Sequence, residues 1–130
     1  MKLVMTMTEF EDTAILHCKG RLQFCEEAAI FCKLAHGVLD TGRNLVLDFR
    51  GVETIDSSAI GDLVLIYMRA CAAGKEVRIA SPQERVLEVL ELTRVSSLFH
   101  IYPTLDVALA PQGLAQAVDS TSAAPSWRHA

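Results

Sequence analysis

The sequence predicts an α/β fold in which helices pack against a mixed sheet with parallel neighbours. Short apolar, β-branched runs alternate with longer segments at helical spacing, and their order is β-β-α-β-α-β-α-β-α. Two of the strands, at 45–49 and 75–80, flank a segment of helix length, which makes them parallel neighbours in one sheet. A length of 130 residues fits a single domain with about four helices.

The first third of the chain predicts a hairpin followed by a helix. Residues 3–8 and 14–18 have the composition of strands, and an acidic turn over 9–13 joins them. Gly20 is expected to end the second strand. Residues 25–39 carry small and apolar side chains on one helical face, with acidic residues in the first turn, where the helix dipole favours them.

The middle of the chain predicts a strand and a long helix. Thr41–Asn44 is a turn that leads into the strand at 45–49, whose sequence is Leu-Val-Leu-Asp-Phe. The helix is expected to run from Ser57 to Ala73, and Gly74 is expected to stop it in a left-handed conformation.

The last elements are a strand, a helix, a strand and a short helix. After the strand at 75–80, Ser81-Pro82-Gln83-Glu84 is typical of a capping box, and its helix should end near Thr93. A strand is expected over 99–102, and an amphipathic helix follows Pro103-Thr104. We interpret 1–110 as the folded domain and 111–130, which is rich in Gln, Ser, Ala and Pro, as a mobile tail.

The composition excludes several classes of function. A net charge of −4 without a Lys/Arg cluster argues against nucleic acid, and no apolar run approaches the ~20 residues that a membrane span needs. No basic-then-apolar leader opens the sequence, so a cytoplasmic protein is expected. The cysteines lack metal-ligand spacing, so we expect buried thiols and neither metal nor cofactor; they are Cys18, Cys25, Cys32 and Cys71.

The segment Asp56-Ser57-Ser58 lies where the central strand turns into the central helix. All three residues are types that cap helix N-termini, and the backbone N–H groups at a helix start have no helical partner. A helix start can also hold a phosphate. Two interpretations therefore stay open: a structural cap with no further role, or hydroxyls placed to carry a phosphate.

At 100° per residue, the central helix has two distinct sides. The stripe expected to face the sheet consists of Ile60, Leu63, Val64, Tyr67 and Cys71. The opposite stripe consists of Ser58, Asp62, Leu65 and Arg69. A phosphate above this second stripe would add about −1.5 to −2 charge beside Asp56 and Asp62, and would repel a partner docked there.

The residues from Leu45 to Gly61, which read LVLDFRGVETIDSSAIG, resemble the centre of a STAS domain. The resemblance continues in Gly20-Arg21-Leu22, in the segments around 80–82 and 89–93, and in residues 104–109, so that it covers about residues 3–110 in order. Chains of this length resemble stand-alone bacterial anti-sigma factor antagonists.

This resemblance implies a regulatory function. In that group the unphosphorylated domain binds an anti-sigma factor, typically a serine kinase, and so frees a sigma factor. The kinase phosphorylates the serine directly after the Asp of Asp-Ser-Ser, and a serine phosphatase reverses the reaction. Carried onto this chain, the acceptor is Ser57, with Ser58 as the second candidate and an additional cap. The implied partner-binding residues are Asp56, Ser58, Asp62, Leu65, Arg69 and Gln23.

Three positions depart from the family pattern. Gln23 replaces an acid before the first helix, at a position near the switch surface. Ala59 replaces the glycine of Asp-Ser-Ser-Gly, which predicts a more crowded approach for a kinase. Arg94 stands where glycine is common, which predicts strain if a left-handed residue is needed there.

Other functions remain as alternatives. A non-switching scaffold, as a subunit of a signalling assembly or of a lipid-transport complex, would use the serines only as caps. An enzyme is not expected, because Ser57 has no nucleophile-elbow glycines or histidine motif, and the chain has no phosphate-binding glycine loop. Leu65 and the apolar segment near Met5 and Met7 also leave self-association open.

Overall fold

The computed structural model describes residues 3–23 and 26–110, and the predicted tail at 111–130 lies outside this range. Five strands form one sheet in the order β1-β2-β3-β4-β5, as the predicted mixed sheet requires. β1 is antiparallel to β2, and all other neighbours are parallel. The strands are β1 Val4–Phe10, β2 Thr13–Leu22, β3 Asn44–Ile55, β4 Val77–Ala80 and β5 His100–Tyr102.

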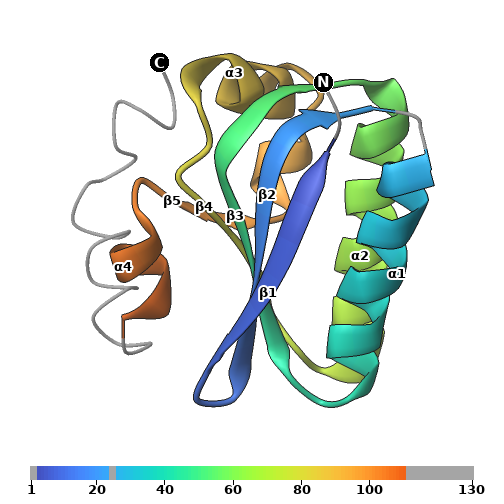
Figure 1. The fold of residues 1–130 in the computed structure, drawn as a ribbon, viewed down its shortest axis with the longest axis vertical. Helices are drawn as coiled ribbons and strands as arrows, with labels where there is room; N and C mark the ends of the chain where they lie inside the picture. The colour runs from blue at the N-terminus through green and yellow to red at the C-terminus, as the bar shows by residue number, and fades with distance from the viewer. Residues whose placement is uncertain (1–2, 24–25, 111–130) are drawn as a thin grey trace.

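Helices cover both faces of this sheet, but unequally (Figure 1). The two long helices lie side by side on one face, and the short α4 lies on the other face. The helices are α1 Glu26–Asp40, α2 Ser57–Ala73, α3 Glu84–Leu92 and α4 Leu105–Leu109, with a 3₁₀ turn, η1, at Val95–Ser97. No helix in the described ranges is long and apolar enough to cross a bilayer.

The main hydrophobic core lies between the sheet and the long helices. Its largest fully buried side chains include Phe31 from α1, Phe49 from β3 and Leu63 from α2. A second, smaller cluster fills the space beneath α4 and includes Ile15, Val46, Tyr102 and Ala108. The apolar alternation of the strands explains both clusters, because successive side chains point to opposite faces.

β2 and β3 are longer than the sequence predicts. Gly20 does not end β2: with φ of 114° it continues the strand, which pairs with β3 as far as Leu22 and Ile55. Two irregularities interrupt this pairing. At Gly51 a Cβ would lie 2.9 Å from the Cys18 carbonyl oxygen, so only glycine permits this close approach of the two strands. The long pair carries the chain to the point where α2 begins.

The predicted bounds of α2 are confirmed, whereas the predicted start of α3 is not. α2 has the predicted bounds, and Gly74 ends it with φ of 68°. The predicted capping box at 81–84 is wrong, because α3 begins at Glu84 and its N-cap residue is Gln83. Ser81 has φ of 55°, and its N–H donates to the Tyr102 carbonyl at 2.9 Å, which ties it to the end of β5.

The cysteines occupy three different environments. Cys18 is buried as expected, and burial, with a smaller contribution from the charge of Asp48, raises the pKa of its thiol to about 12. Cys32 is half-buried, whereas Cys71 is exposed, contrary to the prediction. Cys25 lies outside the described residues.

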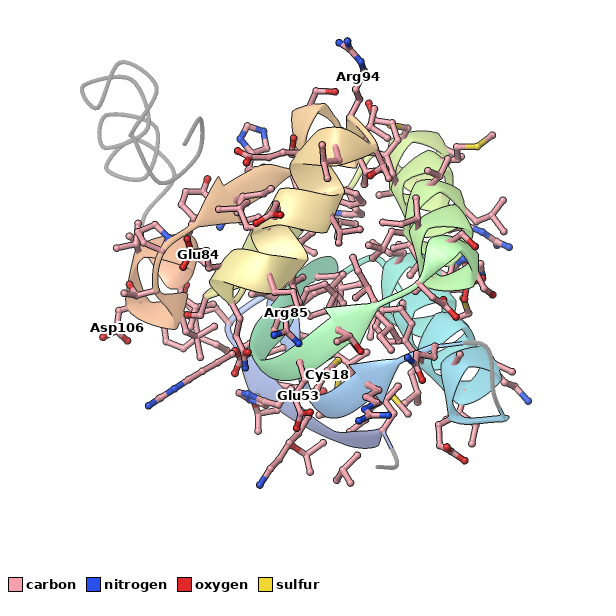
Figure 2. The ribbon with its side chains drawn as sticks, turned by 90° about the horizontal axis from the view of Figure 1, so that it is seen from above. Cys18, Glu53, Glu84, Arg85, Arg94 and Asp106 are labelled. Carbon is pink, nitrogen blue, oxygen red and sulfur yellow. The ribbon has the colours of Figure 1, made fainter. Side chains whose placement is uncertain are left out.

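Arg94 adopts a left-handed conformation, which is the condition under which strain was expected at this position. It follows α3, with φ of 64° and ψ of 12°, and its side chain projects away from the fold (Figure 2). The backbone of a non-glycine residue in this region is strained by roughly 1–2 kcal/mol.

We therefore expect Arg94→Gly to raise the free energy of unfolding by about 0.5–1 kcal/mol, because relief of strain exceeds the added entropy of a glycine in the unfolded chain. Urea denaturation measures this difference. Arg94→Ala is the matched control, since it removes the same charge but keeps the strain. An equal gain from both variants would show that charge, and not backbone strain, is responsible.

Candidate protein-binding site at the start of α2

The parallel strands β2 and β3 end together and bring the start of α2 beside the end of β2. Leu22 and Ile55 are paired in the last register position. The backbone N–H of Asp56 then donates to the Leu22 carbonyl oxygen at 3.3 Å. Gln23 follows Leu22 directly and is exposed, so the structure brings Gln23 and the Asp56-Ser57-Ser58 segment to the same edge of the sheet.

Asp56 is the N-cap residue of α2. Its backbone is extended, with φ of −112° and ψ of −178°, and its Oδ1 accepts a hydrogen bond from the Ala59 N–H at 2.9 Å. Its carbonyl oxygen accepts the first helical hydrogen bond, from the Ile60 N–H at 3.0 Å. The expectation that Ser58 also caps the helix is wrong, because one carboxylate already satisfies the donor that a capping hydroxyl would bind.

The two serines occupy the first two positions of α2 but differ in accessibility. Ser57 is exposed, whereas Ser58 is half-buried. Within residues 3–23 and 26–110, no hydrogen bond engages the hydroxyl of either serine. Ser57 therefore presents its hydroxyl to solvent at the positive end of the helix dipole, and it has no capping role there.

The side of α2 that faces the sheet differs from the predicted stripe. Its buried residues are Ala59, Leu63, Ile66 and Ala70. Ile60, Val64 and Tyr67 are only partly buried, although they pack against the core, and Cys71 is exposed. The small side chains of Ala59 and Ala70 allow α2 to approach the sheet closely. The predicted stripe omitted them because it was built from the larger apolar side chains.

Asp62 and Arg69 of the predicted outer stripe face α1. Arg69 Nη1 lies 3.1 Å from both carboxylate oxygens of Asp40, at the end of α1. Asp62 lies beside the Cys32 thiol. Burial raises the pKa of Cys32 to about 12, and the charge of Asp62 and a hydrogen bond to it contribute further. These two polar residues thus join the long helices at two levels.

One exposed face of α2 carries Ser57, Gly61, Leu65 and Met68, which we call the α2 stripe. Leu65 and Met68 are 53% and 59% exposed. The positions are spaced by four, four and three residues, so that they share one helical face headed by Ser57. Leu65 was predicted from the sequence, whereas Gly61 and Met68 were missed. Gly61 directly precedes the predicted Asp62, and Met68 directly precedes the predicted Arg69.

Ala59 does not crowd this surface. It is fully buried, and its methyl group belongs to the core. The expectation that replacement of glycine hinders the approach of a kinase is therefore wrong, because the added atom points inward.

Several cavities of the described part of the chain lie away from α2. Three of them, of about 330, 460 and 540 Å³, are lined by residues outside α2. No group of three or more potential metal ligands occurs among residues 3–23 and 26–110. The apolar side chains on a helix and the adjacent free hydroxyl suit contact with another protein.

The fold and this surface define a small α/β domain with a helix-start serine beside an open apolar stripe. Comparison with known proteins gives its family: the sequence profile of the STAS domain matches residues 5–108, and the chain belongs to this family.

A Thermotoga neapolitana protein, named as a candidate anti-sigma factor antagonist, is 35% identical over 101 residues, which are 76% of this chain and 88% of that protein. The crystal structure of a candidate antagonist from Thermotoga maritima is similar, with 31% identity and a TM-score of 0.74, and the match covers 81% of this chain and 91% of that chain. The unphosphorylated anti-sigma factor antagonist SpoIIAA shares the fold, with 14% identity, a TM-score of 0.64 and coverage of 92% and 97%. The chain is thus related to the anti-sigma factor antagonists.

We expect Asp56→Ala to lower the free energy of unfolding by about 1 kcal/mol, because it removes the cap of α2. Ser57→Ala should change it by less than about 0.5 kcal/mol, because the Ser57 hydroxyl bonds no described group. Urea denaturation of both variants tests this assignment. The reverse order of the two effects would mean that the serine is the cap.

The raised pKa of Cys32 predicts slow alkylation. At about pH 8 its thiol stays protonated, so iodoacetamide should label the exposed Cys71 well before Cys32, as peptide mass spectrometry can follow. Asp62→Asn should accelerate labelling of Cys32, because loss of the negative charge lowers the thiol pKa. Asp40→Asn, at the other end of the helix pair, is the control. An unchanged Cys32 rate in Asp62→Asn would refute this electrostatic contact.

Proposed function

We propose that this protein is a cytoplasmic anti-sigma factor antagonist that phosphorylation of Ser57 switches off. In the unphosphorylated state the α2 stripe, with Gln23 and Asp56 beside it, binds an anti-sigma factor that is also a serine kinase, and a sigma factor is released. Ser58, Asp62 and Arg69 flank this contact, Ser58 is the second candidate acceptor, and a serine phosphatase restores the binding state. The protein acts by binding and not as an enzyme.

One observation carries this proposal: Ser57 is exposed at the head of an apolar stripe while Asp56 caps the helix. The capping role of Asp56 argues against a purely structural explanation for Ser57. The relationship to anti-sigma factor antagonists supports the choice of partner.

The position of Ser57 also supports a switch that leaves the fold intact. A phosphoserine carries about −1.5 to −2 charge, and a negative charge at the start of a helix is favourable. The modified helix should therefore remain folded. The phosphate charge would lie beside Asp56 and on the same helical face as Leu65 and Met68. A partner that buries the α2 stripe would have to remove water from this charge, which is costly. Binding would be lost without a change in the core.

The experiment begins with capture of the native partner and its incubation with the protein and ATP. We expect one phosphate on Ser57 and none in Ser57→Ala. Ser57→Asp should weaken binding by tenfold or more, or about 1.4 kcal/mol, as isothermal titration calorimetry can measure.

Thr104→Asp is the matched control for the added charge. Thr104 is exposed, it is the N-cap of α4 on the opposite face of the sheet, and aspartate is a good N-cap. This variant should bind as the unmodified protein does. Undiminished binding of Ser57→Asp would reject the switch and favour the alternative of a non-switching scaffold in a signalling or lipid-transport assembly.

A further inference from the structure

β1 is a terminal strand of the sheet, and one of its edges is open. Residues 4–10 pair with β2 on one side. On the other side, neither view of the molecule places another described element (Figures 1 and 2). Alternate backbone N–H and C=O groups of β1 therefore point outward, and they form a template on which another strand can pair.

This edge lacks the features that usually prevent strand addition. β1 has seven residues, contains neither proline nor lysine, and has no bulge in its pairing with β2. Its one charged residue, Glu9, forms an ion pair with Arg43 at 2.9 Å. Val4, Met7 and Phe10 are 56%, 36% and 46% exposed. The strand at the other end of the sheet, β5, has only three residues.

The β1 edge is also ordered before any partner binds. Seven consecutive register pairs connect it to β2. Thr8 Oγ1 lies 2.9 Å from His17 Nε2, and His17 Nδ1 lies 2.7 Å from Asp48 Oδ2, so that side chains connect three strands across the sheet. A strand held in this way loses little conformational entropy when it pairs.

We propose that β1 pairs antiparallel with β1 of a second copy of this chain, about a twofold axis that passes between the two Met7 residues. The sequence of the strand is self-complementary in this register. Val4 lies opposite Phe10 of the second copy, Thr6 lies opposite Thr8, and Met7 lies opposite Met7. Exposed apolar side chains thus meet on both faces, and each Glu9 lies opposite Met5, so that no like charges face each other.

The helix above this edge fits the same twofold arrangement. Ile30 and Leu34 of α1 are 50% and 38% exposed. Cys32 of α1 faces α2, because it lies beside Asp62. Ile30 and Leu34 are each two residues from Cys32, which is about 160–200° round the helix. They are therefore on the flank of α1 that points away from α2. Pairing of two β1 strands places these flanks on the same face of one continuous ten-stranded sheet.

The dimer leaves the α2 stripe accessible, because α2 packs over β3 and β4 and not over β1. Two seven-residue strands form an interface at the small end of the range for protein complexes, so we expect dissociation constants in the micromolar range. Each dimer would then present two independent Ser57 surfaces.

Analytical ultracentrifugation across about 1 µM to 1 mM protein, with reductant present to prevent disulfides at Cys71, tests this proposal. The wild-type chain should change from monomer to dimer within that range. Met7→Lys should raise the dissociation constant tenfold or more, because two like charges then face each other across the axis. Met7→Glu should have the same effect.

An equimolar mixture of Met7→Lys and Met7→Glu should dimerise again, because residue 7 faces residue 7 in this register. Leu92→Lys is the control, since it places a lysine at a 78%-exposed leucine on α3 and should leave dimerisation unchanged. Circular dichroism confirms that each variant is folded. A monomeric wild-type chain at 1 mM, or a mixture that stays monomeric, would overturn the proposal.

Discussion

The hydrogen bonds of Asp56 organise the surface on which the rest of this protein's chemistry depends. Its N–H is held by the Leu22 carbonyl at the end of β2, and its carboxylate binds the Ala59 N–H in the first turn of α2. One residue therefore joins the sheet to the helix and satisfies the helix start. Because the cap precedes Ser57 instead of coinciding with it, the serine side chain is exposed, and a change at Ser57 is separated from the stability of the helix.

The contact between α1 and α2 determines which side of α2 is accessible. Asp62 and Arg69 are polar, but their partners are the Cys32 thiol and the Asp40 carboxylate of the neighbouring helix. The large apolar side chains of α2 that stay exposed are Leu65 and Met68. The polar side chains thus connect the two helices, and an exposed apolar pair lies beside them on the open side of α2.

The two proposed interaction surfaces lie on different parts of this small domain. The α2 stripe is a helical surface over β3 and β4, and its recognition would depend on side chains and on the charge of Ser57. The β1 edge is a backbone surface at the end of the sheet, where hydrogen bonding gives affinity and side-chain register gives specificity. Because one surface is on α2 and the other is on β1, the proposed contacts with a partner and with a second copy do not overlap.

The sequence by itself determined the element order, the parallel neighbours, the bounds of α2 and the conformation of Gly74, because these follow from local periodicity and backbone sterics. That Arg94 is left-handed was decided by the structure, since sterics disfavour this conformation for a residue with a Cβ. Only the tertiary structure decided how far β2 and β3 extend, since Gly20 continues a strand when a neighbouring strand supplies hydrogen bonds. It also decided that Ser81 does not cap α3, because its N–H is bound to the end of β5. The side of α2 that is open depends on the packing of α1, and an isolated helical sequence contains no information about its neighbour.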